Sequence, residues 1–174
     1  MKEFPPICFC PFCGIEVQES EAFGEIRPIC PACGYIHFQD PKVAAGVLVE
    51  SDGKVLLVRR ANVPMQGKWT LPAGFVDGQE DPRSTAVREC LEETGLEIEI
   101  VDLVDVVYGA EHPRGASIVI FYRGRTVGGV LAAGDDADAV GFFEAGDLPP
   151  LGFKATEQVL AQWADKRSDS SDSS

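Results

Sequence analysis

Apolar positions along the chain fall into short runs that predict β-strands, and two other segments repeat at helical spacing. Two of the runs, 43–50 and 54–60, flank Asp52-Gly53, a dipeptide that favours a tight hairpin turn. Further strands are expected over residues 96–109, 117–125 and 139–143. Strands interleaved with helices favour a mixed sheet between helices, an α/β (α+β) fold, over an all-β sandwich.

The first helical segment is expected to cover residues 82–94. Asp81 is suited to cap the first turn, proline is tolerated at the first helical position, and Gly95 supplies a stop. At about 100° per residue, apolar and acidic side chains separate onto opposite sides of this helix. We expect one side to carry Ala86, Val87, Cys90 and Leu91, and the other to carry Glu89, Glu92 and Glu93.

The second helical segment, 154–166, ends the patterned part of the chain. Its apolar stripe consists of Ala155, Val159, Leu160 and Trp163. The polar, acidic residues 168–174 that follow have nothing to bury, so we expect a disordered tail.

Five of the six cysteines lie within the first 33 residues, in a segment too short to fold without a cross-link. Two Cys-x2-Cys pairs are separated by sixteen residues, which is typical of a four-cysteine zinc site built from two knuckles. The expected zinc ligands are Cys10, Cys13, Cys30 and Cys33. Iron, disulfides and unligated thiols are the alternatives, and Cys8 is interpreted as a spare thiol.

The formal net charge of −13 argues against adhesion to nucleic acid or to anionic membranes, because phosphate is repelled over the whole surface. No apolar run approaches the roughly 20 residues that span a bilayer, and the first nine residues lack a signal-peptide pattern. We therefore expect a soluble, cytoplasmic protein without a membrane partner. The cysteine-rich segment is interpreted as a structural or dimer-forming module, so a homodimer is expected.

Three glutamates crowd one face of the first helix, where like charges repel by about 0.2–0.5 kcal/mol per pair. The nearby bases, Arg83 and Arg88, lie N-terminal to the cluster and leave it uncompensated. Oxygen ligands without cysteine or histidine suit hard ions such as Mg²⁺ or Mn²⁺, which bridge to phosphates. The sequence therefore predicts metal-dependent phosphoryl transfer to water.

The residues around this helix are spaced as Gly74-x5-Glu80-x7-Arg88-Glu89-Cys90-x-Glu92-Glu93-x-Gly95-Leu96. This pattern resembles the complete Nudix box, with Cys90 at a position where the family usually has an aliphatic residue. Together with the cysteine pairs, it is similar to NADH pyrophosphatases and to plant-type FAD and ADP-ribose pyrophosphatases. The resemblance implies a zinc ribbon over residues 1–40 and a Nudix domain over residues 41–167, with a mixed sheet sandwiched between helices.

Carried over position by position, the resemblance implies three metal-binding carboxylates, Glu89, Glu92 and Glu93. Arg88 is expected to pair with Glu80 and orient the helix. Gly74 would let the backbone approach the metal ion, and the carbonyl of Ala73 or Gly74 would complete its coordination.

Family members commonly add a carboxylate from a distant loop, as metal ligand or general base. We favour Asp136 for this catalytic role, with Glu111 as its competitor and a solvated turn as the alternative interpretation of the aspartates there. The residues assigned to substrate binding are Arg60 and Arg114 for phosphates and Tyr108 for stacking on a base.

These inferences predict a pyrophosphohydrolase that cleaves a nucleoside diphosphate linked to another moiety, such as ADP-ribose, FAD or an NADH-like dinucleotide. An alternative within enzymes is a nucleoside triphosphate sanitising pyrophosphatase. An alternative of another class is a non-catalytic module that senses a nucleotide or binds nucleic acid or protein. Four glutamates against one arginine in the cysteine-rich segment argue against a nucleic-acid clamp.

Overall fold

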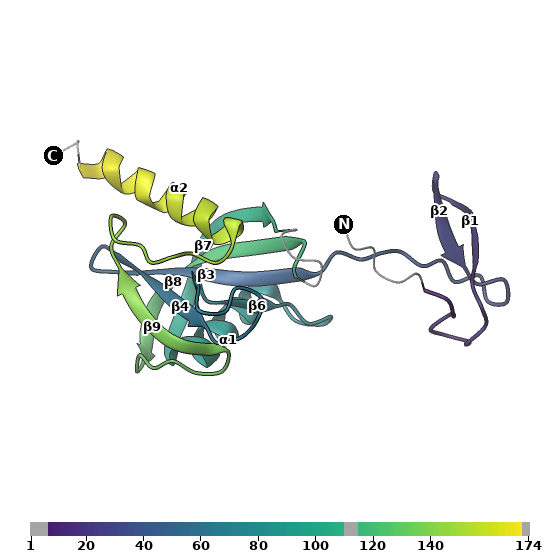
Figure 1. Cartoon of the computed structure of the whole chain (residues 1–174), viewed down its shortest axis with the longest axis horizontal. Helices are drawn as coiled ribbons and strands as arrows, with labels where there is room; N and C mark the ends of the chain where they lie inside the picture. Colours follow the sequence, from purple (N-terminus) through teal and green to yellow (C-terminus); the bar gives the residue numbers. More distant parts are fainter. Residues whose placement is uncertain (1–6, 110–114, 172–174) are drawn as a thin grey trace. The chain divides into compact units, whose positions relative to one another are not determined.

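The computed structural model describes residues 7–109 and 115–171 of the chain. The chain divides into two compact units, Met1–Asp40 and Pro41–Ser174 (Figure 1). No helix within the described ranges is both long and apolar enough to span a membrane.

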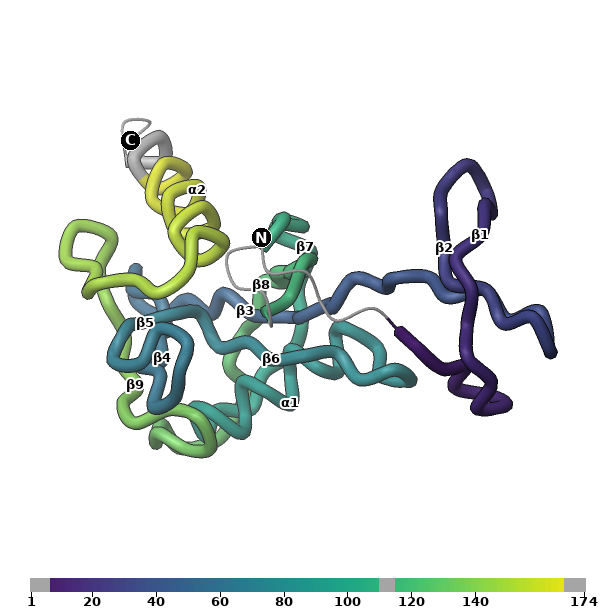
Figure 2. The backbone as a smooth tube through the Cα atoms, turned by 45° about the vertical axis from the view of Figure 1, so that its right-hand side comes forward, coloured from purple at the N-terminus to yellow at the C-terminus, as the bar shows by residue number. Residues whose placement is uncertain are grey.

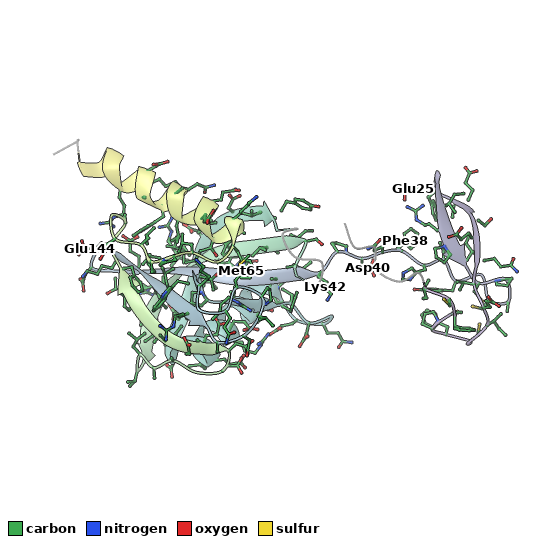
Figure 3. The ribbon with its side chains drawn as sticks, viewed as in Figure 1. Glu25, Phe38, Asp40, Lys42, Met65 and Glu144 are labelled. Carbon is green, nitrogen blue, oxygen red and sulfur yellow. The ribbon has the colours of Figure 1, made fainter. Side chains whose placement is uncertain are left out.

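The first unit is a small ribbon of two antiparallel strands, β1 (Gln18–Ala22) and β2 (Glu25–Ile29). Beside them, the guanidinium carbon of Arg27 lies 5.0 Å from the centroid of the Phe38 ring, and Arg27 also pairs with Glu25 at 2.8 Å. Glu25 and Phe38 are labelled in Figure 3. The sequence did not predict these strands because most of their side chains are exposed, so they lack a clear apolar run.

The second unit is built on a seven-stranded mixed sheet (Figure 2). Its strands are β3 (Val43–Ser51), β4 (Lys54–Arg60), β5 (Trp69–Thr70), β6 (Ala73–Phe75), β7 (Leu96–Tyr108), β8 (Ile118–Gly129) and β9 (Ala137–Phe143). The order is β5-β4-β3-β8-β7, with β6 also paired to β3 and β9 to β4. β3 and β8 run parallel, whereas the other pairs are antiparallel. The predicted mixed sheet and its five expected strands are confirmed.

The predicted hairpin joins β3 to β4. Asp52 and Gly53 have φ angles of 49° and 79°, and positive values at both positions are what a type I′ turn requires. Ser51 pairs with Lys54 directly across the turn. The hairpin fixes the register of β3, so that Val47 faces one side of the sheet and Leu48 the other.

Two helices, α1 (Pro82–Thr94) and α2 (Lys154–Ser171), cover opposite faces of this sheet (Figure 1). Ala86 and Cys90 of α1 pack with Val47 in one apolar cluster. The stripe predicted for α2 is confirmed in the other cluster, where it packs against Leu48 and Phe121. Glu89, Glu92 and Glu93, which α1 carries, therefore lie on the side of the sheet opposite to α2.

Three expectations about the helices are wrong. Leu91, expected on the apolar side of α1, is 46% exposed, whereas Glu93, expected on the acidic side, is only 4% exposed. Glu93 is buried because β6 covers it, and its carboxylate accepts a hydrogen bond from the β6 backbone. α2 continues to Ser171, so residues 168–171 are helical instead of part of a tail, since no glycine or proline stops the helix after Trp163.

Candidate functional site

α1 is held in place by the caps that the sequence predicted at its two ends. Asp81 accepts a hydrogen bond from the Arg83 N–H at 2.7 Å. At the other end Gly95 has a φ of 70°, and its N–H donates to the Leu91 carbonyl at 2.8 Å. These caps fix the start and the end of the helix on which the three glutamates are carried.

Arg88 is the centre of an ion-pair network on α1. Its Nε and Nη2 each donate to the Glu80 carboxylate at 2.9 Å, so the pairing implied by the resemblance is present. The same guanidinium donates to Glu89 at 2.7 Å and to Glu92 at 2.9 Å. The hydrogen bonds from Arg88 hold the pKa of Glu80 down at about 2. The expectation that the cluster lacks a basic partner is therefore wrong for Glu89 and Glu92.

Glu93 differs from the other glutamates because its carboxylate is inside the protein. Its Oε2 accepts the backbone N–H of Ala73 at 3.1 Å. Burial raises the pKa of Glu93 to about 8, and the charges of Glu89 and Asp136 act in the same direction, while the Ala73 N–H and the charge of Arg60 oppose them. A positive ion beside this carboxylate would favour its charged form.

Glu89 lies directly against the backbone of β6. Its carboxylate carbon is 2.0 Å from the position that a Cβ atom on Gly74 would occupy, so a side chain there would displace it. Burial raises the pKa of Glu89 above its ordinary value, although the hydrogen bond from Arg88 opposes this, and the charge of Asp135 adds to it. Glycine at position 74 therefore lets the Glu89 carboxylate approach the main chain of β6 closely.

The segment between β8 and β9 is attached to the C-terminal end of α1. The Ala132 N–H donates to the Thr94 carbonyl at 2.9 Å, and the Gly134 N–H donates to the Glu93 carbonyl at 3.2 Å. These contacts bring the following aspartates to the same end of the helix as Glu93. They also satisfy carbonyl groups that have no partner within the helix.

Asp136 is the aspartate of this segment whose charge acts on Glu93. Its Oδ1 accepts a hydrogen bond from Asn62 at 2.7 Å. Asp138 is engaged elsewhere, in an ion pair with Arg59 at 2.6 Å. The charge of Asp136 therefore acts on one glutamate of α1 and that of Asp135 on another, and Asp136 stays the predicted catalytic aspartate. Its competitor Glu111 lies outside the described residues.

The residues assigned to substrate binding fall in different places. Arg60 ends β4, where its Nε donates to the Pro64 carbonyl at 2.8 Å and its charge acts on Glu93. Tyr108 is 79% exposed on β7, which β8 and β3 separate from β6, so it is not brought beside the glutamates. Arg114 lies outside the described residues.

The donor set of this site suits a hard cation. The carboxylates are Glu80, Glu89, Glu92, Glu93 and Asp136, and the cationic side chains that act on them are Arg88 and Arg60. An excess of carboxylate oxygen is the environment that Mg²⁺, Ca²⁺ and Mn²⁺ prefer. Burial is the main cause of the raised pKa values of Glu89 and Glu93, and a cation bound beside them would favour their charged forms.

The thiols of the two Cys-x2-Cys pairs converge in the first unit. The four sulfur atoms all lie within 4.8 Å of one another, with three pairs at 3.4–3.7 Å. Sulfurs at the corners of a tetrahedron around zinc, with bonds of about 2.3 Å, would be about 3.8 Å apart. Gly14 and Gly34 donate to the carbonyls of Cys10 and Cys30 at 2.9 and 3.0 Å, so the two knuckles have the same geometry. Cys8 is exposed and outside this cluster.

Residues 40–164 match the NUDIX domain family. The chain belongs to the Nudix family. This Nudix chain is a hydrolase, and the reaction class is pyrophosphohydrolysis of nucleoside diphosphate-linked compounds. Nudix hydrolases use divalent metal ions and act on nucleotides.

Several Nudix proteins are similar to this chain. The ADP-ribose pyrophosphatase of Methanocaldococcus jannaschii is 41% identical over 120 residues, which are 68% of this chain and 69% of that protein. The NAD-capped RNA hydrolase NudC of Pseudomonas aeruginosa is 28% identical over 145 residues, 82% of this chain but 50% of that protein. A crystal structure of a NUDIX hydrolase from Nitrosomonas europaea is 34% identical with a TM-score of 0.82, covering 94% of this chain and 93% of that one.

Gly74→Ala is expected to lower hydrolysis by about 100-fold without unfolding the Nudix domain, because the added methyl group displaces the Glu89 carboxylate. Glu89 ends in a flexible side chain that can swing aside, so the melting temperature should change little. Turnover, Mn²⁺ binding and thermal melting would be compared with Gly78→Ala. Gly78 lies in the loop that follows β6, with no atom within 4 Å of an added Cβ. Equal activity in the two variants would contradict the role of this close approach.

Arg88→Lys is expected to reduce kcat/KM by about 10–100-fold, because a lysine ammonium cannot contact both oxygens of Glu80 and two helix glutamates at once. Steady-state kinetics would measure the loss. Arg125→Lys is the matched control, since Arg125 pairs with Glu99 at an exposed position of β8. A similar loss in both variants would show that the effect is not specific to the network on α1.

Proposed function

We propose that this Nudix hydrolase is a Mg²⁺- or Mn²⁺-dependent pyrophosphatase of ADP-ribose, with FAD and NADH-like dinucleotides as the next candidates. The observation that carries the proposal is that Glu89 and Glu93 both lie against the β6 backbone, at Gly74 and Ala73, while the charge of Asp136 acts on Glu93. The choice of ADP-ribose is supported by the 41% identity with an ADP-ribose pyrophosphatase.

The metal ions would be held by Glu89, Glu92 and Glu93, together with a main-chain carbonyl at Ala73 or Gly74. A bound divalent ion supplies charge neutralisation of the pyrophosphate and a water of lowered pKa. Arg88 and Glu80 hold the glutamate side chains in the orientation needed for this coordination.

Asp136 is proposed as the general base that accepts a proton from the attacking water. Attack forms a new P–O bond and breaks the bridging P–O bond, so ADP-ribose and water give AMP and ribose 5-phosphate. Arg60, at the end of β4, would contact a phosphate oxygen. Arg114 is proposed as a second contact to phosphate.

The four converging cysteines are proposed to bind one structural Zn²⁺. Backbone N–H groups of Cys33 and Ala32 lower the pKa of Cys30 to about 6, whereas the hydrogen bond with Cys30 raises the pKa of Cys13 despite the backbone N–H of Ile15, so one thiol of this pair is the first to ionise. Residues 1–40 would then be a zinc ribbon and residues 41–167 the Nudix domain, with α2 continuing beyond that boundary to Ser171. We further propose that the protein is cytoplasmic, because four thiols grouped as metal ligands suit a reducing compartment, and that the ribbon joins two copies in a homodimer.

A substrate panel tests this function directly. ADP-ribose, FAD, NADH, dinucleoside polyphosphates and nucleoside triphosphates would be incubated with Mg²⁺ or Mn²⁺, and the products identified by chromatography. The highest kcat/KM for ADP-ribose, with AMP and ribose 5-phosphate as products, supports the proposal. Pyrophosphate release from triphosphates with ADP-ribose left intact would favour the sanitising alternative, and nucleotide binding without any turnover would favour a non-catalytic module.

A further inference from the structure

Asn62 and Asp136 connect two loops at the edge of the carboxylate site. The Asn62 side-chain amide donates to Asp136 Oδ1 at 2.7 Å, and the Ala61 N–H donates to the Asp136 carbonyl at 2.8 Å. Both the main chain and the side chain of Asp136 are thus held from the loop that follows β4. Asp136 is exposed, and an exposed aspartate without such contacts samples several rotamers.

The loop that carries Asp136 is also held from its other side. Gly134 donates to the Glu93 carbonyl of α1 at 3.2 Å, two residues before Asp136. Asp135, between them, adopts a φ of 48°, a left-handed conformation that turns the chain sharply. The backbone around Asp136 is therefore held by α1 as well as by Ala61, whereas the direction of the Asp136 carboxylate is fixed by Asn62.

The loop after β4 does not need Asn62 for its own structure. Gln66 donates to the Ala61 carbonyl at 2.8 Å, and Gly67 donates to the Arg60 carbonyl at 2.8 Å, so the loop is closed by other bonds. The Asn62 amide instead donates to Asp136, which lies in the other loop. The hydrogen bond from Asn62 therefore fixes the orientation of the Asp136 side chain and contributes little to the structure of the loop after β4.

We propose that Asn62 is a positioning residue that orients the Asp136 carboxylate toward Glu93 and the reacting water. A hydrogen bond to one oxygen fixes the plane of a carboxylate, and with it the direction of the lone pairs on the other oxygen. The proposal rests on the general-base function proposed for Asp136. It assigns to a neutral amide, outside the Nudix box, a part in setting the rate of the chemical step.

Steady-state kinetics with ADP-ribose and Mg²⁺ test the proposal. Asn62→Leu keeps the volume but removes the donor, so kcat should fall about tenfold while KM stays within about twofold. Asn62→Asp should lose more, because it sets a second carboxylate against Asp136, and Asn62→Gln should recover part of the rate. Val63→Ala, in the same loop at a side chain that is 79% exposed, is the control and should keep wild-type kcat.

A double-mutant cycle separates this inference from the proposed function. If Asn62 acts through Asp136, Asn62→Leu should cause no further loss in an Asp136→Asn background. A tenfold loss in that background would overturn the positioning role. An impaired Asp136→Asn beside an unaffected Asn62→Leu would refute the Asn62 inference alone, whereas wild-type turnover in Asp136→Asn would refute the general-base assignment and, with it, the inference.

The contact can also be measured without turnover. In metal-free protein, the side-chain amide signals of Asn62, identified by their loss in Asn62→Leu, should shift in the NMR spectrum of Asp136→Ala. They should not shift in Asp135→Asn, since asparagine tolerates the left-handed conformation at that position. Signals that stay in place in Asp136→Ala would show that the pair does not form in solution, which would overturn the proposal.

Discussion

The Glu93→Gln variant is expected to lose Mg²⁺-dependent hydrolysis by on the order of 10³-fold while becoming more stable than the wild type in the absence of metal. Glutamine keeps an oxygen for the Ala73 N–H but carries no charge for a metal ion. The loss should therefore appear in kcat and in metal affinity, with the fold intact.

The gain in stability follows from the pKa of the buried carboxylate. Burial raises the pKa of Glu93 from 4.5 to about 8, so the folded protein holds this proton more tightly than the unfolded chain does. The associated stability is fully present below pH 4.5 and is lost as the pH rises through about 8. At high pH the cost is on the order of a few kcal/mol for the wild type, and the glutamine variant avoids it.

Chemical denaturation in EDTA at pH 5 and pH 8.5 would measure this difference. Wild-type protein should lose stability between the two pH values, and Glu93→Gln should lose less. Glu99→Gln, at an exposed position of β7, should behave like the wild type in stability and turnover. Wild-type hydrolysis by Glu93→Gln, or an identical pH dependence of stability, would contradict the assignment.

Cys30→Ser is expected to release zinc and unfold the Met1–Asp40 unit while the Pro41–Ser174 unit stays folded. The ribbon has few buried apolar residues, and its large side chains Phe12 and Phe23 are 78% and 79% exposed. A bound metal must therefore supply most of its stability. Structural zinc contributes about 10–16 kcal/mol of apparent binding free energy in comparable small modules.

Elemental analysis and limited proteolysis would test this expectation. One equivalent of zinc should be found in the wild type and in Cys8→Ser, because Cys8 is outside the cluster, and much less in Cys30→Ser. Cleavage confined to the first unit is the expected pattern in Cys30→Ser. Loss of zinc from Cys8→Ser, or full retention in Cys30→Ser, would show that the ligand set differs from the one proposed.

The sequence was informative wherever a local rule determines the structure. The hairpin at Asp52-Gly53 and the caps at Asp81 and Gly95 depend on a few neighbouring residues, and all are confirmed. The convergence of four thiols depends only on the spacing of two knuckles and is also found. These features are set by backbone conformation and short-range hydrogen bonds, which sequence patterns record directly.

Other features depend on contacts between distant segments, and sequence patterns missed them. Helical periodicity placed Glu93 on an acidic surface, but β6 covers it in the structure. Counting charges along the chain gave Arg88 no part in neutralising Glu89, although its side chain reaches forward along α1. The link between Asn62 and Asp136 joins loops 74 residues apart, a separation that no local pattern can predict.

The attachment of residues 130–134 to α1 limits how this enzyme can diverge. Val130, Ala132 and Gly134 donate in turn to the carbonyls of Gly95, Thr94 and Glu93, every second residue along the segment. An insertion or deletion of one residue in this segment would turn these N–H groups away from the helix carbonyls and move Asp136 away from α1. Substitutions at exposed Leu131 and Ala133 leave the spacing intact. This segment can therefore change in composition but not in length.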